Sequence, residues 1–173
     1  MFVPRCAIPH SSKPTPAVRP IDNAKISGLN QTASPQDQVW LPWLDIVLAT
    51  LAWCQSMASV PAVGKFDHID AYQVWPSRTT DHWAAFLLTR DLASRRVAYR
   101  NLALNFGALG SVWGCCWLSC ALAVTLSGAL SLAVVAYVDD FITLAPFPCT
   151  LDGVLDIHDA LGIPILRSTD KLQ

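Results

Sequence analysis

Two adjacent aspartates, Asp139 and Asp140, lie between two apolar runs, residues 132–137 and 141–145. Both runs are short and rich in β-branched and aromatic residues, which predicts two strands. The short connection between them predicts a tight hairpin with both carboxylates at its tip. Neighbouring carboxylates repel each other, and a divalent cation such as Mg²⁺ would remove that repulsion. The simpler interpretation is a solvated turn that contains two aspartates.

A third carboxylate, Asp67, follows a short and mostly apolar segment, residues 61–66, which predicts a strand ending at this aspartate. Phosphoryl transfer with two metal ions needs carboxylates from separate strands that converge on ions about 4 Å apart. An aspartate at the end of one strand and an aspartate pair at a hairpin tip meet that need. The three residues together therefore form a candidate metal site.

Three segments resemble, in order, the sequence motifs of the reverse transcriptase palm. Residues 67–72, an aspartate followed four residues later by an alanine and an aromatic residue, resemble motif A. Residues 104–111 (Leu-Asn-Phe-Gly-Ala-Leu-Gly-Ser) resemble motif B, and residues 137–140 (Tyr-Val-Asp-Asp) resemble the motif C box. Residues 161–164 (Leu-Gly-Ile-Pro) resemble the end of motif D in gypsy-type and DIRS-type retroelements. Three ordered matches are far more specific than one short motif.

The resemblance implies an α+β fold, with a palm-type antiparallel sheet packed on helices, partial fingers and no thumb. It assigns residues 39–173 to a partial reverse transcriptase-like palm. Residues 1–38 are rich in Pro and Ser and predict an irregular lead-in. Asn105 stands where motif B usually has a proline. The chain is therefore expected to be a palm fragment of a longer retrotransposon polyprotein, which supplies the missing fingers, thumb and nuclease domains, or a non-catalytic relic.

The implied activity is that of an RNA-directed DNA polymerase, a nucleotidyltransferase that uses two Mg²⁺ ions. Its nucleic-acid partners would be an RNA template and a DNA primer, and its substrates deoxynucleoside triphosphates. The ring of Tyr72 would lie under the sugar of the incoming nucleotide and exclude a 2′-hydroxyl, whereas Asp70 would be structural. The resemblance implies catalytic and metal-binding roles for Asp67, Asp139 and Asp140, and nucleotide-binding roles for Tyr72, Phe106, Gly107 and Lys171.

An uncharged stretch, residues 101–138, offers a different interpretation. Residues 112–135 within it are enough to span a bilayer, and arginines precede them on one side, as the positive-inside rule requires. This alternative is a small integral membrane protein with one or two spans. The favoured interpretation divides the stretch into a buried helix over residues 111–127, an end at Gly128 and a strand over residues 132–137. It explains why the stretch stops at an aspartate pair.

Periodicity assigns the remaining elements. Apolar residues at helical spacing predict a core helix within residues 39–60 and a second helix over residues 150–161, with Gly162 just after its end. Residues 82–89 and 96–104 predict extended segments, and the reverse transcriptase resemblance implies that they form a hairpin between motifs A and B.

Composition narrows the class of protein. A length of 173 residues predicts one domain, and a net charge of −1 gives no global basic field of the kind that marks nucleic-acid-binding proteins. Six cysteines without paired CxxC spacing predict reduced structural thiols, and the apolar run around Cys115, Cys116 and Cys120 predicts that these three are buried. The absence of an apolar signal segment near the start favours an intracellular location, in the cytoplasm or nucleus. His68 and His82 are interpreted as ordinary polar residues, because Mg²⁺ prefers oxygen donors.

Overall fold

The computed structural model describes residues 2–9, 18–34, 39, 41, 44–56, 62–84, 86–145 and 150–166. The chain divides into two compact units, each made of two stretches of sequence. Unit 1 comprises residues 1–38 and 72–114, and unit 2 comprises residues 39–71 and 115–173. The described residues contain two β-sheets together with helices, so the predicted α+β class is confirmed.

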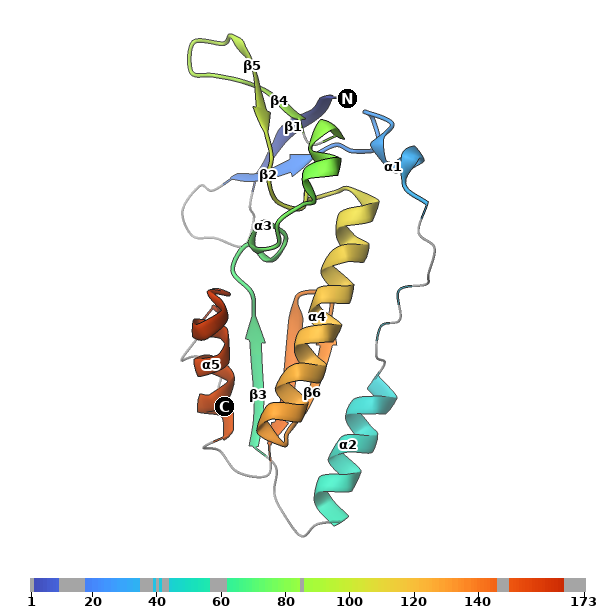
Figure 1. Cartoon of the computed structure of the whole chain (residues 1–173), viewed down its shortest axis with the longest axis vertical. Helices are drawn as coiled ribbons and strands as arrows, with labels where there is room; N and C mark the ends of the chain where they lie inside the picture. Colours follow the sequence, from blue (N-terminus) through green and yellow to red (C-terminus); the bar gives the residue numbers. More distant parts are fainter. Residues whose placement is uncertain are drawn as a thin grey trace. The chain divides into compact units, whose positions relative to one another are not determined.

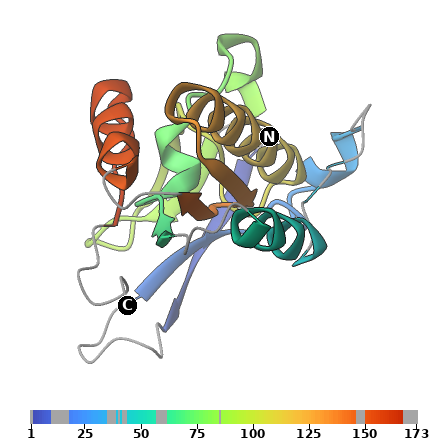
Figure 2. The same ribbon diagram turned by 90° about the horizontal axis from the view of Figure 1, so that it is seen from below.

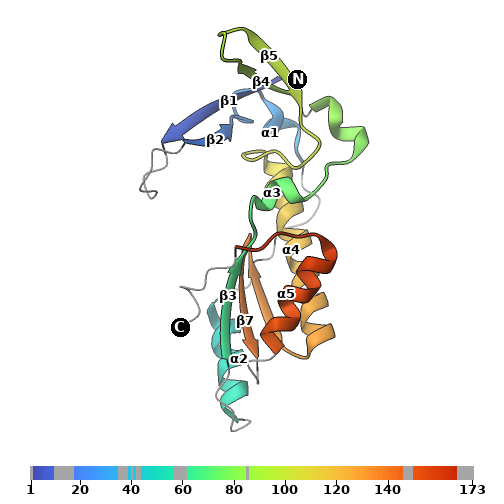
Figure 3. The same ribbon diagram turned by 90° about the vertical axis from the view of Figure 1, so that its left-hand side faces the viewer.

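Along the described part of unit 2, the chain forms a helix, a strand, a second helix, a two-stranded hairpin and a final helix (Figure 1). The strands are β3 (Ala62–Asp67), β6 (Ala133–Tyr137) and β7 (Asp140–Ala145), and the helices are α2 (Leu44–Ser56), α4 (Leu109–Leu130, of which residues 115–130 belong to unit 2) and α5 (Thr150–Leu161). The sheet is antiparallel, in the order β3-β7-β6. Figures 2 and 3 show α4 and α5 on one face of this sheet and α2 along the other. The predicted hairpin and the predicted helix over residues 150–161 are confirmed.

An aromatic cluster joins α5 to the sheet. Phe66 and Phe141 are register partners on β3 and β7, and their rings stack with centroids 4.7 Å apart. The ring of His158, on α5, meets Phe66 edge-on at a centroid distance of 4.9 Å. Phe141 is fully buried, and burial of a phenylalanine side chain contributes roughly 1.5–3 kcal/mol. These contacts therefore fix which face of the sheet α5 covers.

Two histidines are buried beside this cluster. Nε2 of His68 and Nε2 of His158 lie 3.2 Å apart, and Nδ1 of His158 lies 2.7 Å from the carbonyl oxygen of Val154. Because a carbonyl oxygen only accepts, Nδ1 of His158 carries a proton, and its Nε2 accepts the hydrogen bond that Nε2–H of His68 donates. Burial, and secondarily His158, lower the pKa of His68 to about 4. His68 is therefore a neutral core residue, which its sequence context did not predict.

Helix α4 extends beyond the predicted end at Gly128. Ser131, with a φ of 51°, follows the helix in the left-handed conformation that typically ends one. The hydroxyl of Ser127 accepts a hydrogen bond of 3.1 Å from the backbone N–H of Val134 and so ties the end of α4 to β6. The stretch at 112–135 is therefore broken into helix and strand, as the favoured interpretation predicted.

Burial along α4 is one-sided. Trp117 and Val124 are 52% and 73% exposed, so the prediction of a buried helix is wrong for its outer side. Within the described part of the chain, α4 is the one helix long and apolar enough to cross a membrane. Burial raises the pKa of the Cys115 thiol to about 11, so this cysteine acts as a small apolar side chain, as predicted. The buried side of α4 consists of Ser111, Cys115, Cys116, Ser119, Leu122, Ala123 and Leu126.

Helix α2 forms where a helix was predicted, but its place in a core was not borne out. Leu44 and Leu48 are 68% and 55% exposed, and among the described side chains of α2 only Cys54 is buried. The apolar residues of this helix surround its whole circumference, so one sheet face cannot cover them all.

Unit 1 contains a four-stranded sheet in the order β2-β1-β4-β5. Its elements are β1 (Phe2–Pro9), β2 (Val18–Asp22), α1 (Leu29–Thr32), α3 (Ala71–Val74), the 3₁₀ helix η1 (Thr79–Ala84), β4 (Phe86–Arg90) and β5 (Arg96–Arg100). The hairpin β4–β5 is the one that the resemblance implied, although residues 82–84 are 3₁₀ helix where an extended segment was predicted.

The N-terminal residues contradict the predicted irregular lead-in over residues 1–38. Strand β1 pairs antiparallel with β2 and parallel with β4, so its backbone is hydrogen-bonded on both sides. Arg5 and Asp22 face each other across β1 and β2 and form a bidentate ion pair at 2.7 and 3.1 Å. The partner β4 lies some 80 residues away in sequence, and such non-local pairing overrides a Pro-rich local composition.

We expect acid to destabilise unit 2 through the histidine pair. The pKa of His68 falls from 6.5 to about 4 on folding, so between these values the unfolded state binds the extra proton. The free energy of unfolding should therefore decrease by roughly 3 kcal/mol as the pH falls from 6.5 to 4. Urea unfolding at a series of pH values measures this loss. His68→Gln keeps an N–H donor but does not titrate. If the free energy of unfolding of this variant decreased equally steeply with falling pH, protonation of His68 would not be the cause of the loss.

Candidate active site

The register of the sheet in unit 2 brings the predicted carboxylates to one end. Asp67, the last residue of β3, is the register partner of Asp140, the first residue of β7. Tyr137, the last residue of β6, is the partner of Asp140 on its other side. Asp139 lies next to this row, in the two-residue turn between β6 and β7. Asp67 and the adjacent pair Asp139 and Asp140, which are distant from it in sequence, therefore lie at the same end of one sheet.

The turn that holds Asp139 is strained. Val138, the first of its two central residues, has a φ of 58°. A positive φ at this position is the pattern of a type II′ turn, which favours glycine there. A β-branched residue with such a φ is a genuine outlier, and such strain costs of order 1–3 kcal/mol. Outliers of this kind cluster at functional sites, so the strain makes this turn a candidate for a functional role.

Lys65 supplies a positive charge to the site. Its Nζ lies 2.9 Å from Oδ1 of Asp140. The hydrogen bond to Asp140 raises the pKa of Lys65, and the negative charges of Asp140, Asp67 and Asp139 raise it further. The lysine therefore compensates part of the repulsion among the three carboxylates. Lys65 was not predicted as a site residue, although side chains two positions apart on a strand lie on the same face and Lys65 therefore shares the face of Asp67.

A cavity of about 290 Å³ adjoins the row of carboxylates. Polar groups of Lys65, Tyr137 and Asp140 line part of it, and apolar side chains of α2, β6 and β7 line the rest. Tyr137 is 53% exposed, which leaves its ring accessible to a bound molecule. Of the three carboxylates, Asp140 therefore borders a hollow.

The donor set suits Mg²⁺, because three carboxylates offer only oxygen atoms to the ion. Among the described residues, however, no three His, Cys, Asp or Glu side chains already converge as a metal-binding group. Asp140 is instead engaged by Lys65. A metal ion bound at this end of the sheet would therefore displace the ammonium group of Lys65 from Asp140. The carboxylate side chains would also have to reorient toward the ion.

Unit 1 holds the predicted nucleotide-binding residues that the structure describes. The rings of Tyr72 and Phe106 meet edge-on, with centroids 5.2 Å apart, although they are far apart in sequence. Gly107 has a φ of 93°, and a Cβ atom there would overlap the carbonyl oxygen of Asp22, so only glycine fits. The fourth predicted nucleotide-binding residue, Lys171, lies outside the described residues.

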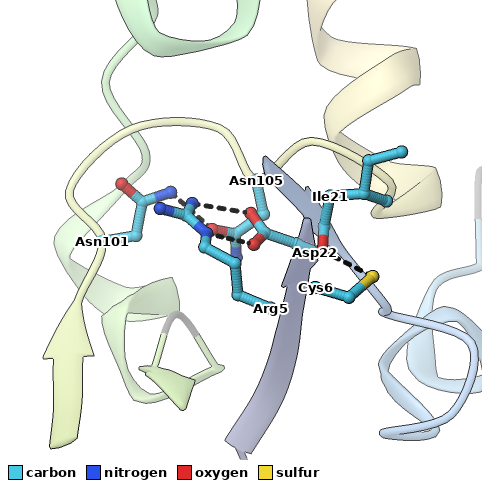
Figure 4. A network of polar contacts seen from close by, with 6 residues as sticks. All are labelled: Arg5, Cys6, Ile21, Asp22, Asn101 and Asn105. Carbon is cyan, nitrogen blue, oxygen red and sulfur yellow. Dashed lines mark hydrogen bonds and ion pairs between the residues drawn. The ribbon is translucent and has the colours of Figure 1, made fainter. Parts of the chain in front are cut away.

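Polar contacts hold the segment that contains Phe106 and Gly107. The side chain of Asn30 donates to the carbonyl oxygen of Gly107 at 3.3 Å and accepts from the backbone N–H of Leu109 at 2.7 Å, so it caps the start of α4. Asn105 is buried and accepts a hydrogen bond from Nδ2 of Asn101, next to the ion pair at Asp22 (Figure 4). The asparagine that replaces the usual proline of motif B is therefore a structural residue.

Comparison with known proteins adds no family assignment. No family model matches the chain, and no curated protein matches it. The resemblance to the reverse transcriptase palm therefore depends on the motifs and on the placement of their residues.

We expect replacement of Val138 by glycine to leave the fold intact. Val138→Gly relieves an unfavourable φ, and this gain offsets the roughly 0.5–1 kcal/mol that glycine costs through chain entropy. The free energy of unfolding should change by less than about 1 kcal/mol. The matched control, Val135→Gly, removes a buried side chain from a central part of β6 and should lose several kcal/mol. Chemical unfolding measures both, and equal losses would show that Val138 is not strained.

Proposed function

We propose that the chain is the palm of an RNA-directed DNA polymerase, a reverse transcriptase of retrotransposon type. The observation that carries this proposal is the register pairing of Asp67 with Asp140, with Asp139 in the adjoining turn. Two-metal nucleotidyl transfer requires such a gathering of carboxylates from separate strands. An antiparallel sheet packed on helices is also the architecture that a palm would have.

The contact between Tyr72 and Phe106 supports the same proposal. The two residues belong to the segments that resemble motif A and motif B, and they touch at a centroid distance of 5.2 Å. Phe106 packs edge-on against Tyr72 and holds that ring in place. A tyrosine ring fixed in this way would exclude the 2′-hydroxyl of a ribonucleotide and select deoxynucleoside triphosphates.

In this proposal, Asp67, Asp139 and Asp140 would hold two Mg²⁺ ions. Bound magnesium stabilises the negative charge that develops during nucleotidyl transfer and favours the attacking form of the primer hydroxyl. Lys65 would keep Asp140 charge-compensated until metal and nucleotide arrive. An RNA template and a DNA primer would be the partners, and fingers, thumb and nuclease domains of a polyprotein would complete the enzyme.

We expect the carboxylates to bind divalent cations, with Mn²⁺ as a spectroscopic probe for Mg²⁺. Asp139→Asn should weaken Mn²⁺ binding at least about tenfold, because it removes a charge while preserving size. Asp70→Asn is the matched control: Asp70 follows Asp67 by three residues, is exposed and has a φ of 52°, which asparagine also tolerates. Electron paramagnetic resonance titration measures free Mn²⁺. Equal affinities in all three proteins would identify the aspartate pair as a solvated turn.

We expect Mg²⁺-dependent primer extension on an RNA template from a polypeptide that joins this chain to fingers and a thumb. Asp139→Asn should abolish extension, whereas Asp70→Asn should be far milder. Tyr72→Ala should retain part of the deoxynucleotide addition and admit ribonucleotides, because the ring no longer occupies the space of the 2′-hydroxyl. A gel-based extension assay reports all three. Undiminished extension by Asp139→Asn would refute the catalytic assignment, and absence of extension by the unmutated polypeptide despite Mn²⁺ binding would indicate a relic.

A further inference from the structure

The near-neutral total charge conceals two units of opposite sign. The two stretches of unit 1 contain nine lysines and arginines against four aspartates, a net charge of +5, and those of unit 2 contain three against nine, a net charge of −6. These two values account for the total of −1. An asymmetry of this size between parts of one chain suggests that the basic part faces a polyanion.

The arginines of the β4–β5 hairpin gather on one face of the sheet in unit 1. Side chains alternate along a strand, so Arg96 and Arg100 share a face. Arg90 is the register partner of Arg96 and joins that face, and all three are exposed. The other face is the buried one, because Leu87 lies there with Val3 of β1, and these side chains are 4% and 0% exposed.

This arrangement is unfavourable in the isolated protein. Like charges that stand directly opposite each other on adjacent strands destabilise a sheet, and Arg90 opposes Arg96. In the described part of the chain no carboxylate forms an ion pair with Arg90, Arg96 or Arg100. By contrast Arg95, in the turn of the same hairpin, is bound to Asp91 at 2.7 Å. Protection of an edge strand needs charge but does not require three arginines on one face.

Aromatic rings continue the same face. Phe86 is the register partner of both Arg100 and Phe2, so these three side chains form one row across β5, β4 and β1. The rings of Phe2 and Phe86 lie 6.0 Å apart, and Phe2 is 57% exposed. A basic surface with accessible aromatic rings is the combination that binds single-stranded nucleic acid, with arginines on the phosphates and bases stacked on the rings.

We propose that the exposed face of this sheet, formed by Phe2, Phe86, Arg90, Arg96 and Arg100, binds a single-stranded nucleic acid. The identification of that strand as a template rests on the proposed function. The binding itself needs no metal and no nucleotide. It also explains how a chain without a global basic field binds nucleic acid.

The test is fluorescence anisotropy with the full chain, without Mg²⁺, and a labelled single strand of about 20 nucleotides, long enough for several phosphate contacts. The triple variant Arg90→Gln/Arg96→Gln/Arg100→Gln should bind at least about tenfold more weakly, and the slope of log K against log salt should decrease by about 0.7 per arginine. Phe2→Ala should weaken binding at least about fivefold, because one stacked base is lost. Thermal unfolding checks that each variant remains folded.

Matched controls separate this surface from general basicity and from catalysis. Arg78→Gln removes an exposed arginine of unit 1 that lies outside the sheet, and this variant should bind the single strand nearly as tightly as the unmutated chain. Arg100→Gln alone should bind it measurably more weakly. Asp139→Asn should bind as tightly as the unmutated chain. An unchanged affinity in the triple variant, or equal affinity for duplex and single strand, would overturn the proposal. Binding without primer extension would count against the proposed function alone.

Discussion

The register of β3 against β7 governs both the core and the candidate site of unit 2. Six residue pairs join these strands, and successive side chains point to opposite faces of the sheet. In this register Phe66 stacks on Phe141 toward α5, while Lys65 and Asp67 share the opposite face with Asp140. A slip of one residue would move each of these side chains to the other face and bury carboxylates in place of aromatic rings. The hydrophobic core therefore determines where the carboxylates stand.

Sequence patterns predicted the elements whose signals are local. Two short runs rich in β-branched residues, joined by a two-residue connection, predicted the β6–β7 hairpin. Apolar residues at helical spacing, followed by Gly162, predicted α5. The break between α4 and β6 was also predicted, but its position was wrong, because the left-handed residue is Ser131 and not Gly128. A serine rarely adopts that conformation, so its position gives no local signal for the end of a helix.

Features that depend on distant partners could not be predicted from local patterns. His68 and His158 are 90 residues apart in sequence, and nothing near either residue indicates that they share a hydrogen bond in the core. Strand β1 pairs with β4, which is distant in sequence, and this pairing makes a Pro-containing segment a central strand of its sheet. Of the candidate site, the three carboxylates were predicted, whereas Lys65 was missed because its role follows from the pairing of β3 with β7.

The separation of charge between the units matches what the two proposed binding surfaces would require. A site for divalent cations must be acidic, and a surface for a phosphate backbone must be basic. If both sets of charges shared one sheet, the arginines would neutralise the carboxylates that attract the metal, as Lys65 already does at one position. The chain passes between the units after residues 38, 71 and 114, so each unit is built from two separate stretches of sequence. For that reason a net charge computed over the whole chain hides the basic face. Grouping the residues by unit separates the basic part of the chain from the acidic part.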